Sequence, residues 1–358
     1  MNKHILAAAI AAAVCSTASA QSNVEIYGLL DVGLEHVTNA SASSGSVTKV
    51  TTGGSNNSRL GFRGAEDLGN GLKAVYNLEA GILADTGASD GPLFRRQSNV
   101  GLEGSFGRVV LGRSFTTVYD FINPFDPMGY APRYSWGPSG NGTLASKYGM
   151  NTAFDNMVKY SGDFGPLKIG ASYGAGEVAG NDADGRKLAA AVAYEAGPAR
   201  FALTGERVNG TTNAAGARSV NKVYHAAAAY KVTKDVDLKL VYRNYKLSPA
   251  AGSDVRADTW WTGANYKLTP AVTLIGAVYY ENIKAGAKPV DTKSDPMMFV
   301  FSARYAFSKR TFVYATAAHV KAKDGGLAGL TRDSTEDGGN TGFSNHQTGL
   351  VLGLQHRF

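Results

Sequence analysis

An apolar–polar alternation with a period of two residues recurs along almost the whole chain and limits the folds it can adopt. From Val236 the sequence reads VDLKLVYRNYKL, in which Val, Leu and Tyr fall on one face and Asp, Lys and Arg on the other. Successive side chains of a β-strand point to opposite faces, whereas a helix repeats its apolar positions every 3.6 residues. The pattern therefore predicts an all-β chain whose strands have one apolar and one polar face.

Sixteen segments of this kind can be counted, and turn-forming residues separate them. They leave about 21 residues for each strand and its connection, which suits the ~9 to 11 residues of a membrane-crossing strand. The segments begin near Val24, Arg59, Leu72, Phe94, Arg108, Met157, Leu167, Leu188, Arg200, Lys222, Val236, Asp258, Val272, Met298, Thr311 and Thr348.

The connections alternate between short and long. Residues 67–71 and 105–107 form short links, whereas residues 39–57 form a long link rich in Gly, Ser and Asn. Short turns at one end and long loops at the other are typical of outer-membrane barrels. A soluble β-sandwich is the alternative for an all-strand chain, but it explains neither this rhythm nor the aromatic strand ends.

The first twenty residues have the pattern of a cleaved signal peptide. Lys3 precedes an apolar stretch from Ile5 to Val14, and Ala18-Ser19-Ala20 offers a small-x-small cleavage site. We therefore expect residues 1–20 to be removed and residues 21–358 to form one domain. No later window contains the roughly 18 consecutive apolar residues of a membrane helix, so a membrane-spanning chain would cross as strands.

Charge, cysteine and histidine contents favour no catalytic or nucleic-acid function. Removing Lys3 leaves 35 basic and 29 acidic residues, and this modest excess is scattered along the chain instead of forming a stripe. The only cysteine, Cys15, lies in the expected signal peptide, and the remaining histidines lack metal-ligand spacing. We expect no enzyme activity, cofactor, metal or nucleic-acid partner.

Four segments of the chain have a specific pattern: SRLGFRGAEDLGNGLKA from Ser58, VEIYGLLDVGL from Val24, VGLEGSFG from Val100, and the ending GLQHRF, which stops at Phe358. At these segments, and over essentially the whole mature chain, the sequence resembles the trimeric Gram-negative general porins, particularly those of β-proteobacteria. The segment from Ser58 is the most specific match, and the segment from Val24 is similar to the family's first strand. The stretch from Val100 matches the next hairpin, and the ending resembles the terminal strand that directs barrel assembly.

This resemblance implies a 16-stranded antiparallel transmembrane β-barrel that assembles as a homotrimer in the outer membrane. It also implies that the third external loop folds into the lumen, and residues 115–156 are in the right place for that loop. The expected function is a water-filled general diffusion channel for small hydrophilic solutes and ions, with weak anion selectivity. Outer-membrane lipid and lipopolysaccharide are the expected surroundings. A solute-specific channel for phosphate or organic anions is the alternative.

A general porin selects ions by a transverse field between basic residues on the wall and acidic residues on the inserted loop. Leu60 and Phe62 must face lipid, which turns Arg59 and Arg63 into the lumen. Arg59 also matches a wall arginine of the family. Strict alternation would turn Arg95 inward, whereas the family match favours Arg96 as the inward arginine.

On the loop, Asp120 and Asp126 are the candidate acidic residues, and Arg133 and Lys147 are the basic candidates. Family members usually carry an acidic residue beside a Pro-aromatic-Gly turn, and Pro-Phe-Asp-Pro at Asp126 matches this pattern only loosely. Ala153 stands where the family often has another basic wall residue. By alternation, Glu79 and three other acids also point into the lumen, which would temper any anion preference.

Overall fold

The computed structural model describes residues 23–41, 45–139, 148–286, 295–324, 326–330 and 344–358. The expected signal peptide, residues 1–20, lies outside these ranges. Among the described residues there is one short α-helix, α2 (Thr117–Ile122), followed by a 3-10 turn, η1 (Asn123–Phe125). Neither is long and apolar enough to span a bilayer.

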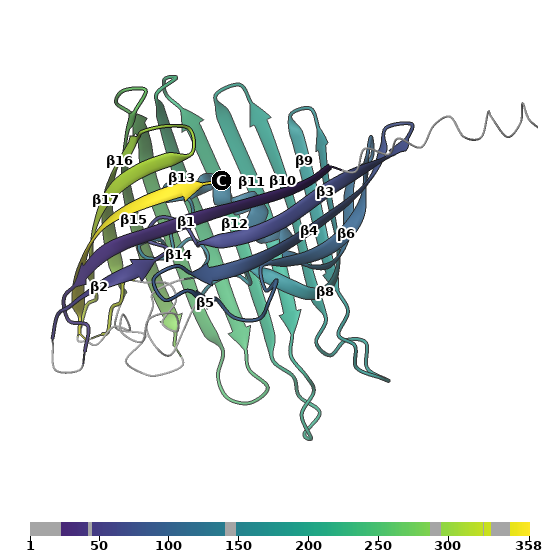
Figure 1. Cartoon of the computed structure of the whole chain (residues 1–358). Coiled ribbons are helices and arrows are strands. Elements are labelled where there is room, and N and C mark those ends of the chain that lie inside the picture. The colour runs from purple at the N-terminus through teal and green to yellow at the C-terminus, as the bar shows by residue number, and fades with distance from the viewer. Residues whose placement is uncertain (1–22, 42–44, 140–147, 287–294, 325, 331–343) are drawn as a thin grey trace, which may run out of the picture.

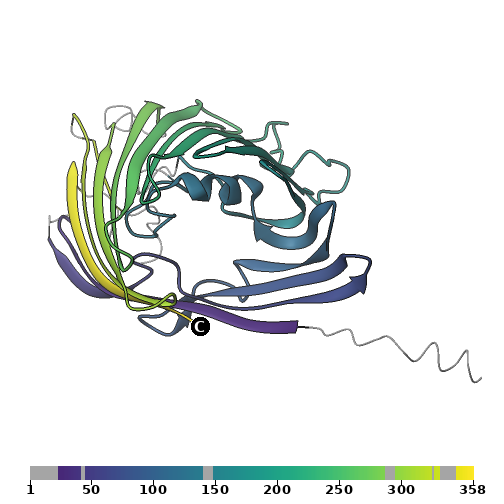
Figure 2. The same cartoon turned by 90° about the horizontal axis from the view of Figure 1, so that it is seen from above.

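Antiparallel strands make up the rest of the regular structure and close into a barrel (Figures 1 and 2). The prediction of sixteen wall strands is confirmed. The wall consists of β1 (Asn23–Val37), β3 (Arg59–Gly69), β4 (Leu72–Leu83), β6 (Gln97–Gly104), β7 (Gly107–Phe115), β8 (Ala153–Phe164), β9 (Leu167–Gly174), β10 (Lys187–Ala196), β11 (Ala199–Asn209), β12 (Val220–Lys231), β13 (Val236–Ser248), β14 (Val255–Lys267), β15 (Val272–Ala285), β16 (Met297–Ala306), β17 (Thr311–Lys321) and β18 (His346–Arg357).

The first strand closes the barrel because its two halves pair with different strands. Its first half pairs with β3, and its second half, from Leu29 to Val37, pairs with β18. The short strand β2 (Val47–Thr52) covers the other edge of that second half, while β5 (Ala88–Ser89) only extends β4. Gly28 and Phe358 exchange two backbone hydrogen bonds of 3.1 Å, so the last residue completes the seam.

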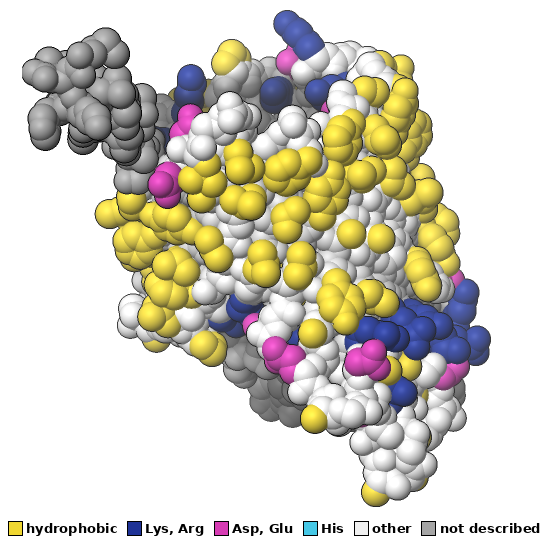
Figure 3. Space-filling view, turned by 90° about the vertical axis from the view of Figure 1, so that its right-hand side faces the viewer, with side chains coloured by type: hydrophobic (Ala, Val, Ile, Leu, Met, Phe, Trp, Pro, Cys, Tyr) yellow, Lys and Arg dark blue, Asp and Glu magenta, His cyan; other side chains and the backbone are white. Residues whose placement is uncertain are grey.

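Burial is reversed relative to a soluble protein. Along β13, Leu238 and Leu240 point outward and are 44% and 49% exposed. Arg243 points into the barrel and is fully buried. On the face shown in Figure 3, the exposed apolar side chains form a broad band across the outside of the barrel. An apolar exterior and a polar interior are what a closed sheet needs in lipid, because closure satisfies every backbone hydrogen-bonding group.

The described part of the chain between β7 and β8, residues 116–139 and 148–152, runs through the inside of the barrel (Figure 2). Helix α2 lies beside β10 and β11, and the following segment buries Tyr134 and Trp136 completely. Trp136 packs 6.3 Å from the ring of Tyr279 on β15. The inserted segment therefore fills one side of the lumen and, together with inward-facing wall residues, forms the buried apolar cluster of the described part of the chain.

Candidate functional site

Two wall arginines share one glutamate. Arg59 begins β3, Arg96 directly precedes β6, and Glu79 lies on β4 between them. The Glu79 carboxylate accepts a hydrogen bond of 2.7 Å from Arg96 Nε and lies 3.6 Å from Arg59 Nε. Tyr27 donates a second hydrogen bond, of 2.8 Å, to the same carboxylate. The arginines are therefore held in place by a charge that neutralises only one of them.

Helix α2 faces these arginines across a cavity of about 340 Å³. Arg59, Glu79 and Arg96 line it from the wall, and Asp120 lines it from the helix. Lys159 on β8 forms an ion pair with Asp120 and donates a hydrogen bond of 2.9 Å to the carbonyl of Phe115. Lys159 lines the adjoining cavity of about 200 Å³, which shares Asp120 with the first. Across the two cavities, the cations Arg59, Arg96 and Lys159 thus lie near the carboxylates of Glu79 and Asp120.

A stack of aromatic rings joins the arginine wall to the inserted loop. The Arg96 guanidinium lies 5.2 Å from the centre of the Phe115 ring, which stacks on Tyr119 at 4.7 Å. Tyr119 in turn contacts Tyr130 at 4.8 Å. Burial raises the pKa of Tyr130 well above its usual value, so its hydroxyl stays protonated and donates to the carbonyl of Tyr119. The stack keeps the helix at a fixed distance from the wall.

Asp126 lies elsewhere than the sequence predicted, because it is fully buried beneath the loop instead of lining the cavity. Its carboxylate accepts hydrogen bonds from the amide of Tyr130 and the hydroxyl of Ser135, both at 2.6 Å. The hydroxyl of Tyr279 on the barrel wall donates another. A buried carboxylate persists when hydrogen-bond donors surround it, and here one of the donors, the Tyr279 hydroxyl, attaches the loop to β15.

Arg133 is also buried, with 3% of its surface exposed. It donates to the hydroxyl of Thr51 and, at 3.2 Å, to the carbonyl of Thr52, and it lies 4.0 Å from Glu35. These contacts attach the loop to β1 and β2. The Arg133 guanidinium therefore does not face the open lumen. Lys147 lies outside the described residues.

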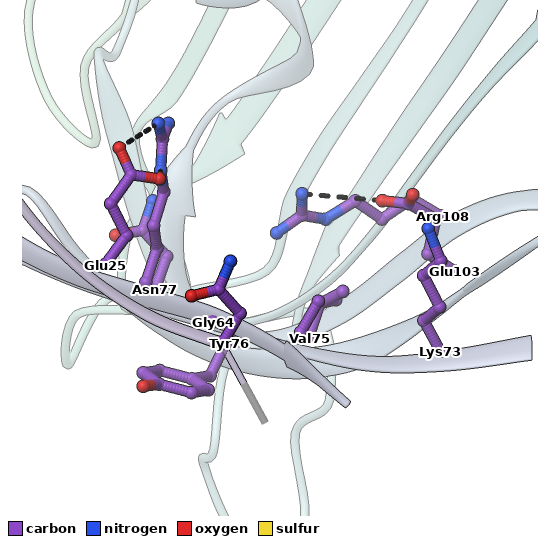
Figure 4. A pocket seen from close by; sticks show the side chains of 11 residues that line it. Glu25, Gly64, Lys73, Val75, Tyr76, Asn77, Glu103 and Arg108 are labelled. Atoms are coloured by element: carbon purple, nitrogen blue, oxygen red, sulfur yellow. Dashed lines mark hydrogen bonds and ion pairs between the residues drawn. The ribbon is translucent and has the colours of Figure 1, made fainter. Parts of the chain in front are cut away.

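The remaining two predicted arginines have separate partners. Arg95 pairs with Asp90 at 2.6 Å, away from the shared glutamate. Arg63 forms two hydrogen bonds of 2.8 Å with Glu25 near the end of the barrel that carries the short turns. It lines a second cavity of about 310 Å³ along the wall, together with the ion pair between Arg108 and Glu103 (Figure 4).

Sequence reasoning missed Lys159 and a group of cations on the opposite wall. Lys159 follows Val158, which is 44% exposed, so alternation along β8 would have turned the lysine inward. Lys239 bonds the carbonyl of Asp126 at 3.1 Å, and Arg200 pairs with Asp237 at 2.6 Å. Alternation along the strands places Lys239 and Arg200 on the inward face, but only the fold shows that they lie under the loop.

A closed barrel whose lumen is narrowed by an inserted loop between charged walls defines the molecule as an outer-membrane channel. Residues 7–325 match the sequence model described as Gram-negative porin. The chain belongs to that family, and it is a general diffusion porin of the outer membrane.

Two curated relatives and two solved structures illustrate the likeness. The chain is 30% identical to outer membrane porin protein 32 of Delftia acidovorans over the full length of both proteins. It is 29% identical to the major outer membrane protein P.IB of Neisseria meningitidis, covering 88% of this chain and 92% of that protein.

Among solved structures, an anion-selective porin from Comamonas acidovorans superimposes with a TM-score of 0.79 and 26% identity, covering 94% of this chain and all of that one. A trimer form of OmpT from Vibrio cholerae gives a TM-score of 0.69 over 94% of this chain and 99% of that one. At 17% identity, the second structure shares the fold alone.

Proposed function

We propose that this porin is weakly anion-selective. The observation that carries the proposal is the charge on the two adjoining cavities that share Asp120. Arg59 and Arg96 line the cavity between β3 and α2, and Lys159 lines the adjoining one. Together these three cations outnumber Glu79 and Asp120. A narrow passage with low-dielectric walls concentrates the field of such an excess and raises the local concentration of the opposite ion. The similarity to an anion-selective porin supports the same direction.

The reversal potential of the purified protein in a planar bilayer under a KCl gradient tests this proposal. We expect the sign that corresponds to chloride preference, and a preference that weakens as salt is raised, because mobile ions screen the wall charges. A reversal potential of the cation-selective sign would refute the anion preference while leaving the channel itself intact.

The oligomeric state and the membrane surroundings of this protein follow from its membership of the porin family. We propose a homotrimer, supported by the trimer form recorded for a protein of the same fold, with outer-membrane lipid and lipopolysaccharide around it and small hydrophilic solutes and ions passing through it. The channel carries out passive diffusion and no enzymatic reaction. Residues 1–20 act as a cleaved export signal, and residues 21–358 form the barrel domain with its constriction loop at 115–156.

A channel specific for phosphate or organic anions remains the second candidate. It is favoured by the small size of the arginine-lined cavity, about 340 Å³, and by the amide groups of Asn56, Asn57 and Asn123 that also line it. Saturable, competitive block of chloride conductance by phosphate would support this candidate. A flux that rises linearly with phosphate concentration would favour general diffusion.

A further inference from the structure

Four basic residues form a row across the outer surface of four adjacent strands. In the strand register, Arg207 on β11 lies opposite Lys222 on β12. Lys222 lies opposite Lys246 on β13, which in turn lies opposite Arg256 on β14. Residues directly opposite one another in an antiparallel pair share a face, so the four side chains lie side by side. We call them the basic row.

The basic row faces away from the lumen. Leu203 on β11, Tyr224 on β12 and Trp260 on β14 lie two or four residues along the strand from a member of the basic row, and therefore on the same face. They are 59%, 51% and 45% exposed. Alternation therefore directs Arg207, Lys222 and the other two to the outside. Their inward neighbours, such as Glu206 and Val223, are buried.

The row also has a defined height on the barrel. Each member lies within two residues of a strand end that leads into a long loop, either residues 210–219 or residues 249–254. The aromatic residues Tyr224 and Trp260 lie two and four residues closer to the middle, which corresponds to roughly 7 and 13 Å along a strand. Such aromatic residues mark the boundary of the hydrocarbon region, so the row lies at the level of the lipid headgroups. Figure 3 shows Lys and Arg side chains gathered along this edge of the apolar band.

Carboxylates compensate for only part of this charge. Lys246 pairs with Asp254 at 2.7 Å, and nearby Lys284 on β15 pairs with Asp258. Among the residues that the structure describes, no carboxylate lies within the 4.0 Å ion-pair distance of Arg207, Lys222 or Arg256. Like charges placed directly opposite each other destabilise a sheet, so the row favours an external anionic partner.

We propose that the basic row binds the phosphate groups of phosphorylated lipids in the outer leaflet. This inference deepens the lipid partnership proposed above by giving it a site. Arginine matches phosphate with paired donors, and lysine supplies a compact charge. Acyl chains of the same lipid molecules would lie against the apolar strands below, next to Leu203 and Trp260. That continuity favours a lipid phosphate over free phosphate, because the membrane itself holds lipid phosphates at this height.

The test compares lipid retention by the full-length porin and by the variant R207Q/K222Q/K246Q/R256Q. Each protein is incubated with vesicles that contain bisphosphorylated lipid A, purified in detergent and assayed for lipid A per barrel. We expect the variant to retain at least about tenfold less than the wild type, since each basic side chain near an anionic lipid surface strengthens binding. Dephosphorylated lipid A should bind the wild type as weakly as the variant does. An equal concentration of inorganic phosphate should not displace the bound lipid.

The matched control is K231Q/K234Q/K267Q/K309Q, which removes the same number of charges at the short-turn end of the barrel. The control should retain lipid A like the wild type. Equal retention by the row variant, the same loss in the control, or undiminished binding of dephosphorylated lipid by the wild type would overturn the proposal.

Conductance in a planar bilayer separates this inference from the channel function. The row faces away from the lumen, so the row variant should conduct as the wild type does. If the variant does not fold, the comparison of phosphorylated and dephosphorylated lipid A on the wild type still decides the question.

Discussion

At the scale of single residues, the net charge of the passage depends on a few side chains, two of which share one partner. Glu79 holds Arg59 and Arg96 together, and Lys159 balances Asp120 on the opposite side. Because these charges lie close together in a narrow lumen, changing one alters the field felt by every passing ion. The sign of the selectivity change should therefore follow the sign of the charge removed.

Two substitutions test this dependence in opposite directions. Glu79→Gln should increase the chloride-to-potassium permeability ratio roughly twofold, and Arg59→Gln should decrease it by a similar factor, since each changes the passage by one charge. Reversal potentials in a KCl gradient measure both. Lys234→Gln, in a turn outside the lumen, is the control. A shift of the same sign in both variants would contradict the assignment of these residues to the selective passage.

At the scale of elements, the inserted loop depends on contacts with distant strands. The Asp126 carboxylate accepts a hydrogen bond from the Tyr279 hydroxyl. Arg243 donates hydrogen bonds of 3.2 and 2.8 Å to the carbonyls of Trp136 and Gly137. Each contact satisfies a buried polar group of the loop, and losing one leaves that group without its partner. The loop is therefore held by the wall on which it lies.

Tyr279→Phe should loosen the loop without disturbing the barrel. Removing a hydrogen bond to a buried carboxylate costs about 1.5–3 kcal/mol, and we expect larger open-channel current fluctuations as a result. The neighbouring Tyr280 has the opposite orientation along β15, so Tyr280→Phe is the matched control. Single-channel recordings of the two variants give the comparison, and equal noise in both would argue against Tyr279 as an anchor.

Two external loops are also joined, through Asp184. Its carboxylate accepts hydrogen bonds of 2.9 and 2.5 Å from the amide and hydroxyl of Thr212 and pairs with Arg218 at 2.9 Å. The Thr212 hydrogen bonds hold the pKa of Asp184 below its ordinary value of 3.8. The contact is thus fully formed above that value and is lost as the pH falls through the lowered pKa.

Spin labels at Gly180 and Ala215 measure this contact as a distance between the two loops. The distance distribution should be narrow at neutral pH and broaden below pH 3.8 as Asp184 takes up a proton. Asp184→Asn should give the broad distribution at neutral pH. A narrow distribution in that variant would mean that other contacts join the loops.

At the scale of the whole molecule, Phe358 belongs to the seam between β1 and β18 that closes the barrel. The Phe358 ring covers Gly28, where the absence of a side chain leaves room for it. Deleting Phe358 removes two backbone hydrogen bonds of the seam and this ring contact. We expect a lower yield of heat-modifiable barrel on gel electrophoresis, whereas Phe307→Ala, at an exposed turn, should assemble normally. Equal yields would show that closure does not require Phe358.

The sequence by itself determined the strand count, the face of the regular strands on which a side chain lies, and the position of the long loop, but it left the choice between Arg95 and Arg96 open. A period of two residues fixes the face of a strand independently of what surrounds it, so Arg59 could be assigned to the lumen before its neighbours were known. The length of the connection after Phe115 showed that it is more than a connector, whereas its insertion into the lumen was implied by the resemblance to porins.

Only the tertiary structure decided which charges meet. Alternation gives a face but no register, so it revealed neither the shared partner of Arg59 and Arg96 nor the alignment of the basic row. The loop has no period, and its path depends on non-local hydrogen bonds and packing against β13 to β15. For that reason the sequence predicts Asp126 in the passage, although the fold buries it and leaves Asp120 facing the lumen.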